Sequence, residues 1–484
     1  MGPSSCLLFL AGSRGEDGCE TKARQRNLMP LRIKWFSFGR LVACLVLVFA
    51  IVRFTSVILS EFPLATKGDF YMTLPGGYAE TLNPTLWNSP DLLIPRLEVR
   101  QYFADAERDG ARTYLYGPTQ FLTLYPMVFL DSYAEIARVI LVVYAVLILL
   151  ACWVISKSFD FVSGGDAVSR RLLIYGSTLL FYPLLQALIQ REFEVVILLA
   201  LSLIYWSAIN DKRFALGSLI AYITWFKFLP AVMFPYLIAR RWWKAATAFI
   251  VMCLAIVGLS ELLFGISLFF NRWYFDVTAT NQLTELASSV AFCRAWAPAD
   301  SVGTFASIRW GLCGLQAQGF WIPLPFSYFV LGGLTAFFGG LGFWGFEQSS
   351  QVSPESERWR RVWETSLVII IYSTFFRGHY YYLSALTIPL VALLIRATSG
   401  ATIQKTRLAL AVLAYALLGA FVLPISVLSA AFEVDFWRFY LDHQLYLFGE
   451  ILLLGLVLRE YVQLSCQVTP PEDKPTPAAA GAQI

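Results

Sequence analysis

Long apolar runs follow one another along most of the chain, and short polar stretches separate them. Most of these runs are close to the roughly 20 residues that a helix needs to cross the hydrocarbon core of a bilayer. The alternation of apolar and polar residues that marks membrane β-barrels is absent. The pattern therefore predicts an all-α polytopic membrane protein. The predicted spans are 41–60, 136–156, 172–189, 194–209, 245–270, 321–346, 381–396, 407–430 and 444–461, with a shorter one at 364–376.

Two further apolar segments each allow two interpretations. Residues 116–131 could cross the membrane or lie along its surface as an amphipathic helix. Residues 214–239 could form one long helix with Lys227 at its middle, or two short helices that meet at Lys227. A lysine at the bilayer centre costs roughly 2.5–3.5 kcal/mol on insertion scales, which favours the two short helices.

The basic residues decide between these interpretations. If 116–131 lies on the surface and the chain turns at Lys227, there are about 12 spans, and every short basic cluster shares a side with the basic N-terminal segment. Because cytoplasmic loops are enriched in Lys and Arg, we predict that this side is cytoplasmic. The clusters are Lys157/Arg170/Arg171, Lys212/Arg213, Arg240/Arg241/Lys244, Arg358/Arg360/Arg361 and Arg396/Lys405/Arg407.

This topology divides the chain into three parts. Residues 1–40 are predicted to be a basic cytoplasmic tail, 41–461 the transmembrane domain, and 462–484 a disordered tail rich in Pro and Ala. Within the transmembrane domain, 61–135 and 271–320 are predicted to be large loops on the extracytoplasmic side. We expect the first loop to carry helices that lie along the membrane.

Composition supports a membrane protein and excludes several functions. The chain is 57% apolar and 14% charged, whereas soluble domains are about 45–50% apolar and about 25% charged. No contiguous basic stripe supports nucleic-acid binding, and no Walker lysine loop, serine-hydrolase elbow, HExxH or dinucleotide fingerprint occurs. The eight cysteines include no CxxC pair. Cys293 and Cys313 share the second large loop and could pair if it faces an oxidising space.

Asp69 is the first candidate for chemistry. It lies in the sequence LATKGDFY, directly after the first predicted span. A carboxylate at the membrane surface can act as a general base on a hydroxyl group that attacks an activated sugar. The alternative is a solvated loop aspartate or a helix N-cap.

A second candidate is the charged turn Gln190-Arg191-Glu192-Phe193-Glu194 between two closely spaced apolar helices. Short turns usually need only Gly, Asn or Pro, so the three charges suggest a binding role. They could bind sugar hydroxyls, a phosphate or a metal ion. The alternative is a solvated turn with an internal Arg–Glu pair.

Isolated cations form the third group of candidates. Lys227 lies between aromatic residues, and Arg377 and His379 lie in FFRGHYYYL at the start of a span. An ammonium at membrane depth needs an anionic partner, and Arg and His can bind a phosphate. The alternatives are a snorkelling lysine and an interfacial tyrosine belt, and a belt is also how we interpret His443. Arg53, inside the first span, needs a partner or a position facing the bundle interior.

The order of these motifs resembles a known family. Gly68-Asp69-Phe70 after the first span is similar to the GT-C superfamily of glycosyltransferases that use polyprenyl-phosphate sugars, and most similar to glycosyltransferase family 87, the α-mannosyltransferase group. Other features follow in the family's order over roughly residues 40–400. They are Tyr116-Gly117-Pro118, the polar turn at 190–194, the lysine before a helix ending in Arg240-Arg241-Trp242-Trp243, and His379-Tyr380.

The resemblance implies a GT-C-like bundle and a site on the extracytoplasmic side of the plasma membrane. Asp69 would be the catalytic base, and Lys227, Arg377 and His379 would contact the phosphate of the donor. A mannose-like sugar would pass with inversion from a polyprenyl-phosphate carrier to a lipid or glycan acceptor, with no nucleotide sugar and no required cofactor. Further predicted substrate contacts are Tyr116, Arg191, Glu192, Glu194 and Tyr380.

One departure from the family affects this prediction. Where a Gly-Gln-x-Asn-like turn is expected, this chain has Arg191-Glu192-Phe193-Glu194. The acceptor therefore stays open, and so does the use of a divalent metal by the two carboxylates. The alternative function is a multispan transporter or flippase with Lys227, Glu192 and Glu194 along its path, although no inverted repeat supports it. A membrane scaffold without chemistry is the third possibility.

Overall fold

The fold is described from a computed structural model of the chain. The residues that the structure describes are 21–64, 119, 122–123, 133–164, 166–189, 192–226, 231, 233–264, 333, 337, 340–341, 353–374, 380–399, 404–419, 425–432 and 435–466.

Within these residues every regular element is a helix, and no strand occurs. The helices of the first half are α1 (Thr21–Leu64), α5 (Tyr133–Ser158), α6 (Ala167–Leu180), α7 (Tyr182–Ile189), α8 (Glu194–Ile209), α9 (Arg213–Thr224), α10 (Met233–Ala239) and α11 (Trp243–Phe264). Those of the second half are α16 (Pro354–Thr374), the 3₁₀ helix η5 (Tyr380–Leu386), α17 (Thr387–Thr398), α18 (Lys405–Leu418), α19 (Ile425–Phe432), α20 (Phe436–Asp442) and α21 (Leu445–Cys466). The predicted all-α class is confirmed for this part of the chain.

Four of the described helices are long and apolar enough to cross a membrane: Gly39–Phe62, Arg138–Ser158, Trp243–Leu262 and Tyr380–Thr398. The pair α6 and α7, bent by 54° at its junction, makes a fifth if it counts as one span. The apolar helices α8 and α9 are shorter. The count of about 12 spans and the arrangement of the loops remain predictions.

The segment 214–239 forms two helices, as the placement of Lys227 favoured. Helix α9 ends at Thr224 and α10 begins at Met233. The guanidinium of Arg213, the first residue of α9, lies 5.7 Å from the ring centre of Trp242, just after α10. The chain therefore runs out along α9 and returns along α10 to the same end of the bundle.

Only three residues of the segment 116–131 are described. Thr119 is buried, and its hydroxyl donates a hydrogen bond of 3.2 Å to the carbonyl of Tyr222 in α9. The hydroxyls of Thr123 and Tyr222 are 2.6 Å apart. These bonds anchor the segment to the last turns of α9, while its placement along the membrane surface remains a prediction.

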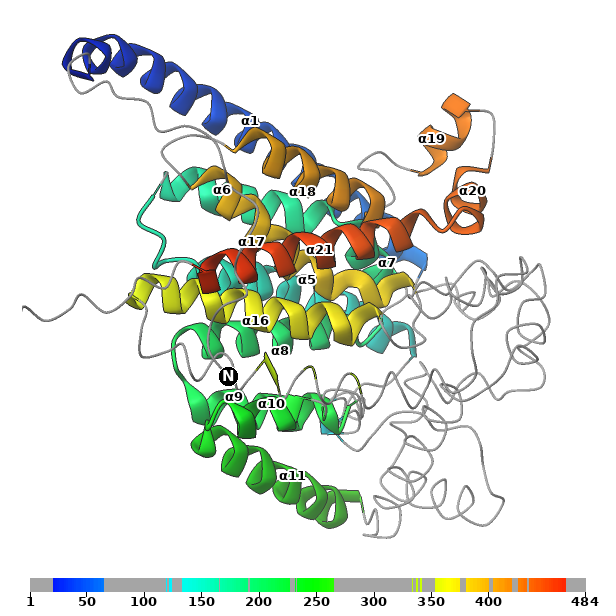
Figure 1. Ribbon diagram of the computed structural model, residues 1–484. Coiled ribbons are helices and arrows are strands. Elements are labelled where there is room, and N and C mark those ends of the chain that lie inside the picture. Colours follow the sequence, from blue (N-terminus) through cyan, green and yellow to red (C-terminus); the bar gives the residue numbers. More distant parts are fainter. Residues whose placement is uncertain are drawn as a thin grey trace, which may run out of the picture.

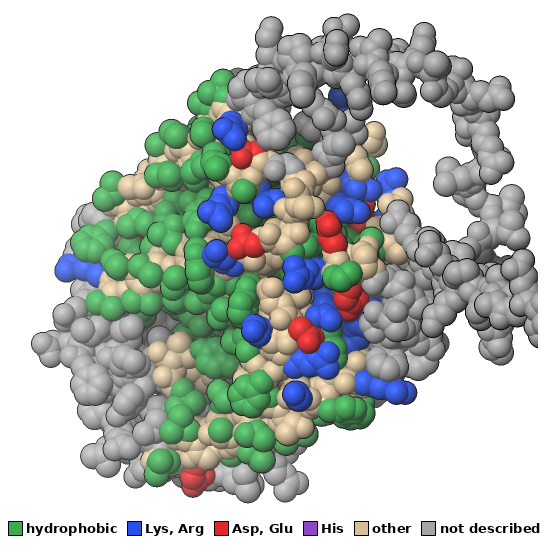
Figure 2. All heavy atoms as spheres, turned by 90° about the vertical axis from the view of Figure 1, so that its left-hand side faces the viewer, with side chains coloured by type: hydrophobic (Ala, Val, Ile, Leu, Met, Phe, Trp, Pro, Cys, Tyr) green, Lys and Arg blue, Asp and Glu red, His purple; other side chains and the backbone are tan. Residues whose placement is uncertain are grey.

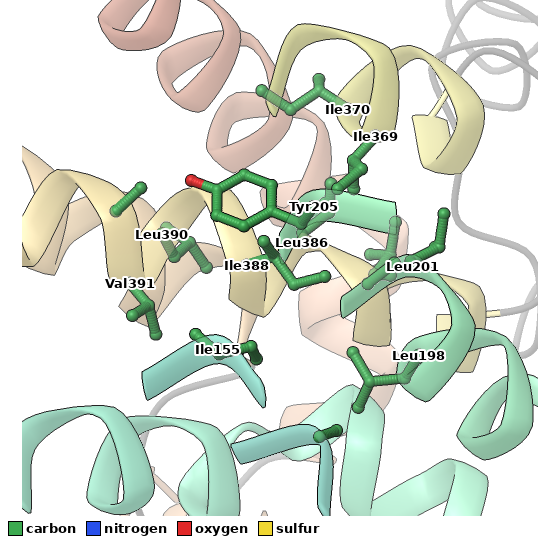
Figure 3. Packing of buried hydrophobic residues seen from close by; sticks show 14 of the residues in the cluster. Ile155, Leu198, Leu201, Tyr205, Ile369, Ile370, Leu386, Ile388, Leu390 and Val391 are labelled. Carbon is green, nitrogen blue, oxygen red and sulfur yellow. The ribbon is translucent and has the colours of Figure 1, made fainter. Parts of the chain in front are cut away.

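The helices form one bundle whose outer members face lipid and whose inner members form the core. Helices α1 and α11 lie at opposite edges of the bundle (Figure 1) and expose large apolar side chains such as Leu45 (60%) and Leu254 (68%). In the interior, Tyr205 of α8 packs among aliphatic side chains of α5, α16, η5 and α17 (Figure 3). The exposed apolar side chains of the outer helices are suited to contact with the lipid chains of a bilayer.

Small residues let several helices pack closely. A Cβ atom added to Gly217 of α9 would collide with the backbone carbonyl of Ala245 in α11. A Cβ atom added to Gly449 of α21 would come within 3.0 Å of Leu417 in α18. Close approach at small residues is the usual packing mode of membrane helices.

Tyrosine hydroxyls pair with carbonyl oxygens where helices break. Next to the bend between α6 and α7, Tyr415 donates a hydrogen bond of 2.6 Å to the carbonyl of Ser177. At the end of α18, Tyr440 donates to Leu417 (2.5 Å) and Tyr380 to Leu418 (2.7 Å). Because lipid offers no hydrogen bonds, a broken helix at this depth needs such internal donors.

The short basic clusters lie at one end of the bundle, as predicted for residues that share a side. Figure 2 views this end and shows Lys and Arg side chains crowded on it, with few acidic side chains among them. Ion pairs connect the clusters there, for example Arg361 with Asp211 (3.1 Å) and Arg407 with Glu460 (2.8 Å). Arg40, at the start of the first span, joins them through Asp166 at 2.6 Å. The compartment that this end faces stays a prediction.

Candidate functional site

The charged turn between α7 and α8 lies at the end opposite the basic clusters. The structure describes Glu192 and Glu194 there, and both are buried, at 5% and 3% exposed. A solvated turn is therefore the wrong interpretation for these two residues. Burial of two carboxylates within three positions is costly, so they need a polar environment.

Local backbone geometry holds the two carboxylates in place. The amide of Glu192 donates to the carbonyl of Ala187 (2.9 Å), which folds the chain back after α7. Glu194 is the first residue of α8, where the helix dipole favours a negative charge. Between them, the ring of Phe193 packs 5.0 Å from that of Phe226, just after α9. The turn is thus fixed against the end of the α9–α10 hairpin.

Hydroxyl groups from two other helices complete this site. Tyr144 of α5 lies within electrostatic range of both carboxylates and of Tyr222. The hydroxyl of Tyr222 in α9 is hydrogen-bonded to the hydroxyl of Thr123. The site therefore combines two carboxylates, which accept hydrogen bonds when ionised, with hydroxyls that both donate and accept. Such a set suits a ligand rich in hydroxyl groups.

Tyr380, a predicted substrate contact, lies at the same end. Its helix η5 packs against α7 and α8, so Tyr380 and the Glu192 turn belong to one region. The side chain is buried, and its hydroxyl donates to the carbonyl of Leu418. Its ring packs against Trp437 at 5.0 Å. These contacts give Tyr380 a structural role at the start of η5, and its contact with substrate stays a prediction.

Two other predictions concern this end of the bundle. Arg53 was predicted to need a partner or a position facing the bundle interior, and its guanidinium lies 5.7 Å from the ring centre of Tyr182. His443 is exposed, its Nδ1 is 2.9 Å from the carbonyl of Phe439, and its ring lies 4.2 Å from that of Phe439. These contacts agree with an interfacial aromatic belt.

Several residues of this region were not predicted from sequence. Tyr144, Tyr182 and Tyr222 lie inside apolar runs, where a single tyrosine looks like any other core residue. Gln186 donates to the hydroxyl of Tyr182 at 2.5 Å. A polar residue inside a predicted span can mark a functional region, and Gln186 is such a residue.

The remaining predicted site residues lie outside the part of the chain that the structure describes, and so do Cys293 and Cys313. These site residues are Asp69, Tyr116, Arg191, Lys227, Arg377 and His379.

Metal binding by the two carboxylates stays open. Among the residues with described positions, no group of three or more His, Cys, Asp or Glu side chains gathers. Glu192 and Glu194 could supply two oxygen ligands for Mg²⁺ or Ca²⁺, which take six or more ligands in all.

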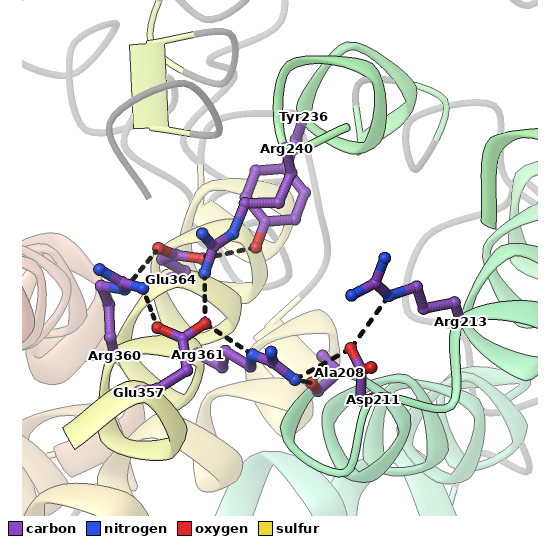
Figure 4. Close-up of polar contacts among 9 residues, drawn as sticks. All are labelled: Ala208, Asp211, Arg213, Tyr236, Arg240, Glu357, Arg360, Arg361 and Glu364. Carbon is purple, nitrogen blue, oxygen red and sulfur yellow. Dashed lines mark hydrogen bonds and ion pairs between the residues drawn. The ribbon is translucent and has the colours of Figure 1, made fainter. Parts of the chain in front are cut away.

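In a second polar cluster, at the basic end, the charged side chains pair with one another. Tyr236 donates to Glu364 at 2.7 Å, Arg240 pairs with Glu357 at 3.0 Å, and Arg360 pairs with the same Glu357 (Figure 4). Arg240, Arg360 and Glu364 are at most 3% exposed. Because each charge has a counter-charge, we assign the cluster a structural role that joins α10 to α16.

Comparison with models of known protein families gives a match. The sequence model of glycosyltransferase family 87 matches residues 114–353. This range holds the turn with Glu192 and Glu194 and the α9–α10 hairpin, and it ends before α16. No curated protein matches the chain significantly.

Proposed function

Because the chain belongs to glycosyltransferase family 87, we propose that this membrane glycosyltransferase takes its sugar from a polyprenyl-phosphate donor. The acceptor is a lipid or a glycan, and the sugar is mannose or a close relative. The observation that carries this proposal is the buried pair Glu192 and Glu194 inside the matched range, which also holds the hydrogen-bonded hydroxyls of Thr123 and Tyr222. Carboxylates and hydroxyls are the groups that recognise sugar hydroxyls.

The reaction proposed is a single displacement. The oxygen of the acceptor hydroxyl attacks the anomeric carbon of the sugar, and its proton passes to the carboxylate of Asp69. The bond between the anomeric carbon and the phosphate oxygen breaks, and polyprenyl phosphate leaves with the electron pair. The anomeric configuration inverts, so one base is enough and no enzyme nucleophile is needed.

In this proposal, different charged residues bind different parts of the substrates. Lys227, Arg377 and His379 bind the phosphate, because cations stabilise the charge that grows on the leaving group. Glu192 and Glu194 accept hydrogen bonds from sugar or acceptor hydroxyls. Tyr116 and Arg191 add further substrate contacts. This division requires no bound cofactor, and a divalent metal at the carboxylates is left to experiment.

The proposed location of the site follows from the distribution of charge. Basic clusters gather at one end of the bundle, and the two carboxylates lie at the other. If the basic end is cytoplasmic, as the positive-inside rule indicates, the site faces outward from the plasma membrane. A polyprenyl-phosphate sugar in the outer leaflet reaches such a site laterally, without a nucleotide donor.

The experiment that tests this function is a transfer assay with the purified full chain in lipid nanodiscs. The substrates are a radiolabelled polyprenyl-phosphate mannose and a lipid extract as acceptor. We expect a labelled glycolipid from the native protein and none from Asp69→Asn, with equal abundance and melting temperature. Full activity of Asp69→Asn would exclude Asp69 as the base. Movement of the labelled lipid between leaflets without a glycosidic product would instead support the flippase alternative.

A further inference from the structure

The basic end of the bundle carries a large excess of exposed positive charge. Among the side chains that the structure describes at this end, nine basic ones and three acidic ones are exposed. We call the nine the basic rim: Arg40, Lys157, Arg171, Lys212, Arg241, Lys244, Arg358, Lys405 and Arg459. The three acidic residues are Asp160, Asp211 and Glu355.

Ion pairing within the protein does not remove this excess. Asp160 pairs with both Lys157 and Arg171, and Asp211 pairs with Arg213 and Arg361. In the described part of the chain, no carboxylate lies within 4.0 Å of the amino groups of Lys212, Lys244 or Lys405. These three lysines stand on three different turns of the chain. Their charge is therefore available to an external anion.

The rim follows the edge of the apolar surface. Arg40 precedes Leu41 (56% exposed), and Lys244 follows Trp243 (60% exposed). On another turn, Lys212 stands two residues before Phe214, which is 69% exposed. Lysine and arginine side chains at such a boundary reach from apolar surface toward the headgroups, and tryptophan prefers the same depth.

This placement indicates which anionic partner fits. A soluble acidic protein would bind a continuous polar face, whereas here Arg40, Lys212 and Lys244 border exposed apolar side chains that need lipid around them. Anionic phospholipids present phosphate groups in a plane next to their apolar chains, which matches the alternation at the rim. We propose that the basic rim binds the headgroups of anionic phospholipids, with Lys212, Lys244 and Lys405 as principal contacts.

This inference concerns the end opposite the proposed sugar site and does not depend on the proposed function. Binding of this kind holds the bundle in the bilayer by its basic end. It also makes the stability of the protein depend on lipid charge and on ionic strength, because salt screens exposed charges. Both dependences can be measured without a transfer assay.

The test compares the full chain in nanodiscs of phosphatidylcholine alone and of phosphatidylcholine mixed with phosphatidylglycerol. We expect a higher melting temperature with phosphatidylglycerol, and a smaller difference at high salt. The triple variant Lys212→Ser/Lys244→Ser/Lys405→Ser loses most of this difference. The control triple variant, with arginine at the same three positions, keeps it. Equal melting temperatures of all three proteins in phosphatidylcholine alone show that the substitutions leave the fold intact.

Native mass spectrometry gives a second readout. We expect the protein released from mixed nanodiscs to retain phosphatidylglycerol, and the serine variant to retain less than the arginine variant. No lipid dependence in the native protein, or the same dependence in the serine variant, would overturn the proposal. Soluble glycerol phosphate added to phosphatidylcholine nanodiscs distinguishes a free phosphate ligand from a lipid headgroup. If it reproduces the full shift, a free anion and not a lipid surface is the partner.

Discussion

The hydroxyl of Tyr380 donates a hydrogen bond of 2.7 Å to the carbonyl oxygen of Leu418. This bond joins the first residue of η5 to the last residue of α18, two elements that are far apart in sequence. Tyr380 is also a predicted substrate contact. A structural role and a substrate role for Tyr380 lead to different results on substitution.

For Tyr380→Phe, we expect a loss of stability without a selective loss of catalysis. The variant keeps the ring contacts and removes one buried hydrogen bond, which contributes about 1 kcal/mol. Thermal unfolding in detergent should show a lower melting temperature, while KM for the donor stays unchanged. An unchanged melting temperature with reduced transfer would show that the hydroxyl contacts substrate instead. Tyr440→Phe, which removes the bonds of another buried tyrosine hydroxyl to Leu417 and Leu418, is the comparison variant.

Removing the charge of Glu192 or Glu194 should weaken substrate binding. Glu192→Gln and Glu194→Gln keep the shape of the side chain and lose a charged acceptor of hydrogen bonds. Hydrogen bonds to charged groups contribute about 1.5–3 kcal/mol, so we expect KM to rise on the order of 10- to 100-fold. Steady-state transfer kinetics with varied acceptor and then varied donor show which substrate is affected. Native KM values for both substrates in both variants would remove these residues from the site.

Asp166 allows a test of the contacts at the basic end. It is the N-cap of α6, accepting from the amides of Val168 and Ser169, and the hydrogen bond from Arg40 holds the pKa of its carboxyl well below its usual range. Asp166→Ala should cost about 1 kcal/mol through loss of the cap. Asp166→Ser keeps a capping side chain and loses the carboxylate that pairs with Arg40 and accepts from the Ser169 hydroxyl.

The pairing of Asp166 also predicts a pH dependence with a definite sign. A carboxyl whose pKa is lowered by folding stabilises the native state above its unfolded pKa of about 3.9, and this contribution is lost as the pH falls below that value. The difference in melting temperature between the native protein and Asp166→Ser should therefore be constant near neutrality and shrink in acid. A difference that grows in acid would contradict the assignment.

Two glycines provide a matched test of helix packing. Gly217→Ala places a methyl group against the carbonyl of Ala245, and overpacking of this kind costs about 1–3 kcal/mol. Gly258→Ala, in α11, meets nothing within 4 Å, so we expect no loss and a small gain from helix propensity. Melting temperatures of the two variants in the same detergent give the comparison. Equal effects would mean that the contact between α9 and α11 is looser than described.

Some of this architecture could be predicted because it depends on composition and charge. The apolar runs located many of the described helices, although the run 407–430 is divided between α18 and α19. The cost of a cation at membrane depth predicted two short helices in place of one long helix over 214–239, and α9 and α10 are separate helices. The basic clusters could be assigned to a common end because charged residues follow the two sides of a membrane. These signals are local, so a single sequence carries them.

Other features depend on contacts between distant segments. Burial of Glu192 and Glu194 results from packing against α5 and α9, and the turn sequence alone suits a solvated loop equally well. In the sequence, Arg240 only helped to predict which loops are cytoplasmic. In the structure, its side chain is buried in an ion-pair cluster with Glu357 and Glu364. The bonds from tyrosine hydroxyls to carbonyl oxygens have no local pattern at all. Each required the positions of at least two helices.

The α9–α10 hairpin has a consequence for the biosynthesis of the protein. At a rise of 1.5 Å per residue, α9 is about 18 Å long and α10 about 10 Å, and the hydrocarbon core is about 30 Å thick. Neither helix can hold itself in lipid, and the partners that shelter them include α11 and α16, which follow later in the chain. The ribosome must therefore synthesise residues beyond 364 before the hairpin reaches its final position. Assembly of this enzyme has to wait for its second half.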